Sequence, residues 1–109
     1  MKTRKSTAKA VLMNLHALRI RSSVGDMDAV DALADFDRAV ALARLTKRQK
    51  EALHLVYERD LSQTDAARIM NVSQPAVADF LKKATDRIDD VYEYWAWHDG
   101  ELSAADFAE

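Results

Sequence analysis

The polar side chains best suited to bind another molecule gather in one short stretch of this sequence. Gln74 carries an amide that can both donate to and accept from the edge of an adenine. Asp79 can accept from a cytosine amino group, although its charge repels phosphate. Ala78 can touch a thymine methyl group, and Ser73 and Pro75 stand beside the glutamine at the start of an expected helix. This group predicts contact with the bases of a nucleic acid.

Cations lie on both sides of this stretch, and cations bind the phosphate oxygens of a nucleic-acid backbone. The candidates are Lys47, Arg48, Lys50, Lys82, Lys83 and Arg87. The same six side chains also fit a solvated basic helix face, so both interpretations stay open. A phosphate role predicts that replacing Lys82 and Lys83 weakens binding to all sequences alike, whereas replacing Gln74 changes preference at one base pair.

Catalysis finds no support in the sequence. The three histidines, His16, His54 and His98, are far apart and lack the spacing of metal ligands. A glycine-rich phosphate loop is excluded because the only glycines are Gly25 and Gly100, and the chain has no cysteine. We therefore expect no enzyme activity, no cofactor and no metal site.

Two helices joined by a tight turn would hold the base-reading candidates at a surface. The stretch LSQTDAARIMNVSQPAVADFLKKA contains two helical patterns separated by only three residues. Of these, Asn71 tolerates left-handed backbone angles, Val72 is an apolar plug for the turn, and Ser73 can cap the second helix. Ala66 and Ala67 are small enough to let the second helix cross the first. These features in this order favour a helix-turn-helix over a plain buried helical hairpin.

The remaining chain also reads as helical, so the fold class is all-α, with about five helices that include the helix-turn-helix. The helices are expected from about residue 8 to 21, after Asp26 to about 43, after Thr46, from 63 to about 70 and from 74 to about 97. Asp26 is a candidate N-cap, Thr46 with Gln49 forms a capping box, and Ser62 with Asp65 forms a less complete one. A further short turn is expected within residues 103–109.

Charge divides the chain into three parts, although the net charge is only −2. Residues 1–45 would form a basic helix and then an acidic one, residues 46–88 the helix-turn-helix unit, and residues 89–109 an acidic, aromatic extension. The basic start either follows a DNA backbone or is a solvated terminus. Its cations are Lys2, Arg4, Lys5, Lys9, Arg19 and Arg21.

The same composition guides the expected location. No apolar run approaches the roughly 20 residues that cross a bilayer, and no secretion signal is evident. The lack of cysteine fits a reducing compartment. We expect a cytoplasmic protein without membrane contact.

An apolar stripe on the last expected helix consists of Ile88, Val91, Tyr92 and Trp95, which recur at helical spacing. Such a stripe either binds a second copy, giving the homodimer that many helix-turn-helix proteins use, or folds back onto the N-terminal helices. The sequence leaves both alternatives open.

Residues 45–88 resemble region four of bacterial sigma factors and the related LuxR-type output domain. The shared pattern is L-T-x-x-(Q/E)-(R/K)-x-x-L, then L-S-x-x-x-(I/A)-A, then V-S-x-x-x-V-x-x-x-L. The matching residues are Leu45, Thr46, Gln49, Lys50, Leu53, Leu61, Ser62, Ala66, Ala67, Val72, Ser73, Val77 and Leu81. The start of the second helix, SQPAV, is also similar to LysR-type regulators.

This resemblance implies a DNA-binding helix-turn-helix in a bacterial or phage transcription protein. One departure is that the outward positions, rich in Arg and Glu in sigma factors, are here Gln74, Pro75, Ala76, Ala78 and Asp79. Recognition of a sigma-type promoter element is therefore not expected, while DNA binding is. The preferred prediction is a sequence-specific transcription regulator. The alternative is a sigma-like module that binds RNA polymerase or a ribonucleoprotein component rather than DNA.

Overall fold

The computed structural model describes residues 5–98, which form six α-helices and one π-helical turn with no β-strand. The helices are α1 (Thr7–Met13), α2 (Leu15–Ser23), α3 (Met27–Ala43), α4 (Lys47–Leu53), α5 (Gln63–Met70) and α6 (Gln74–Trp97), and the π-helical turn η1 is His54–Glu58. The all-α prediction is confirmed for this part of the chain. The turn expected within residues 103–109 lies outside the described residues.

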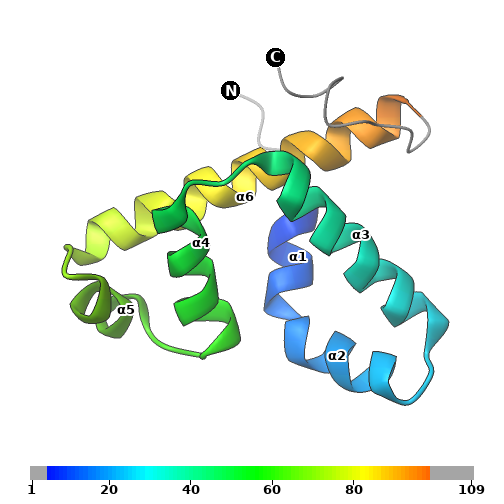
Figure 1. The fold of residues 1–109 in the computed structure, drawn as a ribbon, viewed down its shortest axis with the longest axis horizontal. Helices are drawn as coiled ribbons and strands as arrows, with labels where there is room; N and C mark the ends of the chain where they lie inside the picture. Colours follow the sequence, from blue (N-terminus) through cyan, green and yellow to red (C-terminus); the bar gives the residue numbers. More distant parts are fainter. Residues whose placement is uncertain (1–4, 99–109) are drawn as a thin grey trace.

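Helix α6 is the spine of the molecule. In Figure 1, α4 and α5 lie along its N-terminal half, and α1 and α3 meet its C-terminal half. Its 24 residues span about 36 Å at roughly 1.5 Å per residue, which approaches the 40 Å longest dimension of the molecule. The boundary expected after residue 88 therefore falls inside one continuous helix.

The helix starts follow the capping residues that the sequence predicts. Asp26 accepts from two backbone N–H groups in the first turn of α3. Thr46 and Gln49 form the complete capping box of α4, with hydrogen bonds of 3.1 and 3.0 Å. The hydroxyl groups of Ser62 and Ser73 cap α5 and α6 by accepting from the N–H groups of Asp65 and Ala76. Because these side chains satisfy otherwise unpaired backbone donors, each of these four helices begins at a defined residue.

The first expected helix is divided into α1 and α2, which the apolar spacing did not reveal. At the break, the Asn14 side-chain amide donates to the Ala10 carbonyl at 2.8 Å, and the Asn14 backbone N–H turns to Val11 at 3.1 Å. The side chain thus takes the acceptor that a continuing helix would use. The change of direction buries Leu12 and Leu15 on either side of the break.

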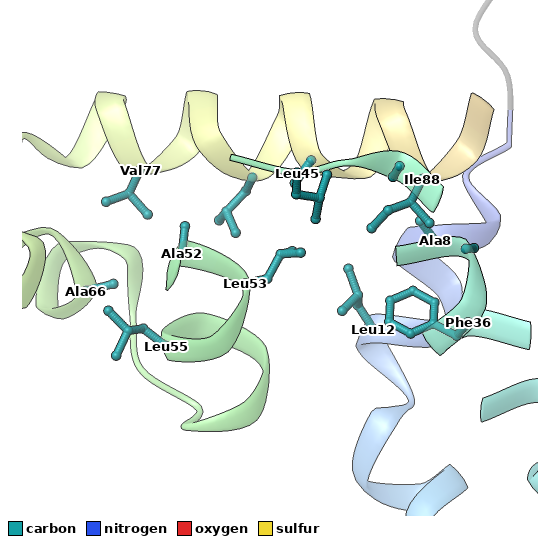
Figure 2. Close-up of a cluster of buried hydrophobic side chains, with 14 of the residues drawn as sticks. Ala8, Leu12, Phe36, Leu45, Ala52, Leu53, Leu55, Ala66, Val77 and Ile88 are labelled. Carbon is teal, nitrogen blue, oxygen red and sulfur yellow. The ribbon is translucent and has the colours of Figure 1, made fainter. Parts of the chain in front are cut away.

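One apolar core joins the two ends of the molecule. Figure 2 shows Val77 of α6 pointing toward Ala66 at one end and Ile88 pointing toward Leu12 at the other, with Leu45 between them. Val77 and Ile88 are completely buried. Since α6 contributes to the core along its length, it holds the α4–α5 unit and the α1–α3 unit in one fixed arrangement.

Candidate nucleic-acid interface

The connection between α5 and α6 has the geometry of a helix-turn-helix. Asn71 adopts left-handed angles, with φ 58° and ψ 47°, as predicted. Val72 packs against the core, and its backbone N–H donates to the Ala67 carbonyl at 3.0 Å. Ala66 and Ala67 are buried in the α5–α6 unit. The small side chains let the two helices approach closely enough to cross.

The polar side of α6 faces solvent. Gln74, Pro75, Asp79, Lys82 and Lys83 are all exposed, as is the capping residue Ser73, and Ala78 is partly buried. The opposite side of the helix carries the buried Val77, Leu81 and Ala84. The side that a nucleic acid would have to reach is therefore free of packing against the chain's own core.

A second glutamine holds the amide of Gln74. Gln63 is the first residue of α5 and Gln74 the first of α6, and Nε2 of Gln74 donates to Oε1 of Gln63 at 2.6 Å. The bond leaves the Gln74 oxygen and one N–H for another partner. The sequence reasoning missed Gln63, because only the crossing of the two helices brings these residues together.

The charges on the outer face of α6 are arranged in pairs. Asp79 forms an ion pair with Lys83 at 3.1 Å, and Lys82 forms one with Asp86 at 2.9 Å, each one helical turn apart. All four side chains are at least half exposed. Exposed pairs of this kind contribute only about 0–1 kcal/mol, so either lysine can exchange its carboxylate for another anion at little cost.

Both arginines of the predicted phosphate-binding set donate hydrogen bonds to the ends of neighbouring helices. Arg48 donates to the Met70 carbonyl at the end of α5 at 2.9 Å, and Arg87 donates to the Ala43 carbonyl at the end of α3 at 2.7 Å. A cation is favourable there because the last carbonyls of a helix are unpaired and form the negative end of its dipole. Both arginines therefore stabilise the arrangement of helices.

The remaining cations of that set are spread over the molecule. Lys47 is exposed at the start of α4, and Lys50 lines a cavity of about 210 Å³ whose walls include Leu12 and Phe36. Neither Lys47 nor Lys50 lines the same pocket as Lys82. The structure thus does not bring the six predicted cations into one patch.

A half-open groove of about 220 Å³ runs beside α6 and includes a cation from α1. Its lining residues are Lys9, Tyr57, Gln63, Ala78, Leu81, Lys82 and Thr85. Lys9 belongs to the basic start singled out in the sequence. Other members of that set are engaged elsewhere: Arg19 pairs with Glu58 at 2.8 Å, and Arg21 with Asp26 at 2.9 Å. Lys2 and Arg4 lie outside the described residues.

The apolar stripe of α6 folds back into the chain, which is one of the two alternatives the sequence left open. Ile88 and Val91 are completely buried, and Trp95 is 9% exposed beneath the guanidinium of Arg38 in α3. Tyr92 packs edge-on against Trp95 with ring centroids 5.4 Å apart. Ile88, Val91 and Trp95 therefore belong to the core of the chain, and the prediction that they form a surface for a second copy is corrected.

The surroundings of this stripe shift the pKa of Tyr92. Burial is the largest cause that raises the pKa of Tyr92, and together with the nearby carboxylates of Asp35, Asp89 and Asp37 it brings the pKa to about 12. Both causes disfavour the phenolate, the first through loss of water and the second through like charge.

Residues 5–98 contain neither a cluster of metal-ligating side chains nor a membrane-spanning helix. No group of three or more His, Asp or Glu side chains there is arranged to hold a metal ion. Within the same residues, no helix combines the length and apolar character needed to cross a membrane.

The left-handed turn at Asn71 and the exposed polar side of α6 behind it define the class of this unit as a helix-turn-helix in an all-α fold. Residues 41–89 match the family described as sigma-70, region 4, and this segment is therefore a sigma-like helix-turn-helix domain. The match covers less than half of the chain, from the last turn of α3 into the second half of α6. No curated protein and no solved structure matches the chain.

Proposed function

We propose that this protein is a bacterial or phage transcription regulator that binds duplex DNA sequence-specifically through α5 and α6. The observation that carries the proposal is the Gln74 amide, held by Gln63 at the exposed start of α6 in a sigma-70 region 4 domain. A side chain fixed before binding loses little conformational entropy when it meets its partner, which favours discrimination between bases.

In this proposal the start of α6 enters the major groove. The free oxygen and N–H of Gln74 pair with the N6 and N7 edge of an adenine. Ala78, one turn further on, is placed to touch a thymine methyl group. Lys82 and Lys83 bind phosphates and set the register of the helix on the duplex. Asp79 restricts the tolerated bases, because it is favourable only opposite a donor such as a cytosine amino group.

A second function has one observation in its favour. Because Asp79 and Asp86 neutralise Lys83 and Lys82, the outer face of α6 is close to neutral rather than strongly basic. Exposed acids on α3, among them Asp28, Asp31 and Asp35, add a negative surface. A sigma-like module that binds RNA polymerase or a ribonucleoprotein component fits these charges, and it is the outcome that an absence of DNA binding would favour.

The test is selection of bound sequences from a random duplex pool, followed by affinity measurements at two salt concentrations. We expect an enriched consensus, and we expect Gln74→Ala to cost about 1–3 kcal/mol on that consensus and little on random duplex. The matched variant Lys82→Ala should weaken both duplexes equally. Equal losses for Gln74→Ala on the two duplexes would remove its reading role, and no binding at low salt would reject the DNA proposal.

A further inference from the structure

We infer that Lys9 of α1, which lies outside the segment that matches the family, is a phosphate-binding group of the same DNA interface. In this arrangement one phosphate of the DNA backbone sits in the groove between α1 and α6, held by Lys9 and Lys82. The inference rests on the proposed function, since it adds a contact to that surface.

The groove brings three donor side chains from three helices together. Lys9 comes from α1, Gln63 from α5 and Lys82 from α6, and all three line the same space. The groove has a volume of about 220 Å³ and is half open to solvent, so a phosphate group can enter it from outside. Gln63 uses its oxygen to hold Gln74, so its N–H groups remain available to an anion.

Lys9 has the most available charge in this group. It is exposed and forms no ion pair with another residue in the range 5–98, whereas Lys82 shares its charge with Asp86. The two arginines further along the basic start, Arg19 and Arg21, are already paired with carboxylates. Among residues 5–98, no carboxylate therefore competes with an entering phosphate for the Lys9 ammonium.

Lys9 is also held in a fixed position relative to the recognition helix. The Ala8 backbone N–H donates to Oδ1 of Asp89 in α6 at 2.8 Å, and Asp89 is only 5% exposed. The Lys9 backbone N–H donates to the Ser6 hydroxyl at 3.0 Å, which caps α1. These two hydrogen bonds fix the backbone of α1 at Ala8 and Lys9 relative to α6, so Lys9 reaches the groove from a defined position.

The position of the groove along α6 agrees with the proposed direction of the DNA. Gln74, Ala78 and Lys82 recur every four residues, and Thr85 follows three residues later, so they form one stripe of the helix. The last three of these residues line the groove, and Gln74 is bonded to Gln63 at its edge. A DNA strand read at Gln74 therefore runs along this stripe toward Lys82 and Lys9.

The test measures the affinity of the full chain for a random duplex and for its selected consensus over a range of salt. Lys9→Ala should weaken both duplexes alike and reduce the slope of log affinity against log salt by about 0.9, the value for one phosphate contact. Lys9→Arg should retain the slope. Lys5→Ala is the matched control. This variant removes the same charge near the start of α1, but Lys5 lines a different cavity.

The outcomes separate this inference from the function on which it rests. If the unaltered chain binds duplex DNA and Lys9→Ala leaves the slope unchanged, the Lys9 contact is rejected and the proposed function stands. If Lys5→Ala lowers the slope as much as Lys9→Ala, the effect is general charge, and the contact in the groove is likewise rejected. If the unaltered chain binds no duplex at low salt, the proposed function fails and takes this inference with it.

Discussion

Among the single side chains, Asp79 is the acid that α6 would present to an anionic partner beside Lys83. It is exposed on the outer face of the helix and neutralises Lys83 at 3.1 Å. Two consequences oppose DNA binding: the carboxylate repels phosphate, and the lysine is shared. Both disappear when the charge is removed, because the pair itself contributes little to stability.

We predict that Asp79→Asn tightens binding to random duplex by roughly 0.5–1 kcal/mol, because it removes one repulsion and frees Lys83. Fluorescence anisotropy at two salt concentrations would measure this, and the salt dependence should become steeper. Asp31→Asn on α3 makes the same change of charge outside α5 and α6 and should have little effect. Unchanged or weaker binding of Asp79→Asn would contradict this role of Asp79.

Tyr92 makes a prediction about alkaline stability. Its folded pKa of about 12 lies above the ordinary value of 10.0, so its stabilising contribution is complete below about pH 10 and is lost as the pH rises toward 12. We expect Tyr92→Phe to reduce the loss of unfolding free energy between about pH 8 and about pH 11 by on the order of 1 kcal/mol. Urea unfolding at both pH values measures it. An identical alkaline loss in the variant would show that Tyr92 titrates alike in both states.

Among the elements, the turn between α5 and α6 sets the direction in which α6 starts. Asn71 adopts left-handed angles that a β-branched side chain tolerates poorly. Ser73 then starts α6 immediately by accepting from the Ala76 N–H at 3.2 Å. The exposed stripe therefore depends on the backbone of one residue.

We predict that Asn71→Val lowers the unfolding free energy by about 1–2 kcal/mol, because left-handed angles cost roughly this much for such a residue. Asn71→Gly is the control, since glycine adopts these angles freely, and it should stay close to the unaltered protein. Thermal and urea unfolding provide the comparison. Equal stability of the two variants would mean that the turn can adopt another conformation.

The π-helical turn η1 links the helix-turn-helix to the N-terminal helices. The Arg59 N–H donates to the His54 carbonyl five residues earlier at 2.9 Å, so α4 ends in a wider turn than the sequence pattern indicated. Glu58 lies in this turn and bonds both His54 and Arg19 of α2. The hydrogen bond from His54 is the largest cause that lowers the pKa of Glu58, and the bond from Arg19 adds to it. Both bonds favour the carboxylate form of Glu58.

Across the whole molecule, α6 makes the two helical units interdependent. Ile88 is completely buried in the core that joins them, and Trp95 further along the same helix reports on the C-terminal end. A substitution that removes packing in the middle of α6 should therefore destabilise both helical units together.

We predict that Ile88→Ala lowers the unfolding free energy by about 2–5 kcal/mol, through lost burial and the cavity left behind. Tryptophan fluorescence and far-ultraviolet circular dichroism should still report one common transition. Ile69→Ala is the control, because Ile69 is 58% exposed and its loss should change stability by less than about 0.5 kcal/mol. Two separate transitions in Ile88→Ala would show that the units unfold independently.

Local chemistry made much of this protein predictable from its sequence. The caps at Asp26, Thr46, Ser62 and Ser73 and the left-handed Asn71 were all identified correctly, because capping and turn preferences depend on a few neighbouring residues. Apolar spacing likewise indicated the buried side of α6. The break at Asn14 and the wider turn at η1 were not predicted, because both are small departures within a continuing helical pattern.

The assignment of polar partners needed the folded chain. Gln63 meets Gln74, Arg87 meets the end of α3, and Lys9 lines a groove with Lys82, although none of these pairs is close in sequence. Periodicity tells which side of a helix is buried, but not which other helix covers it or at what angle they cross. Those two quantities come from packing along α6, and they separate cations that face solvent from cations that hold the fold together.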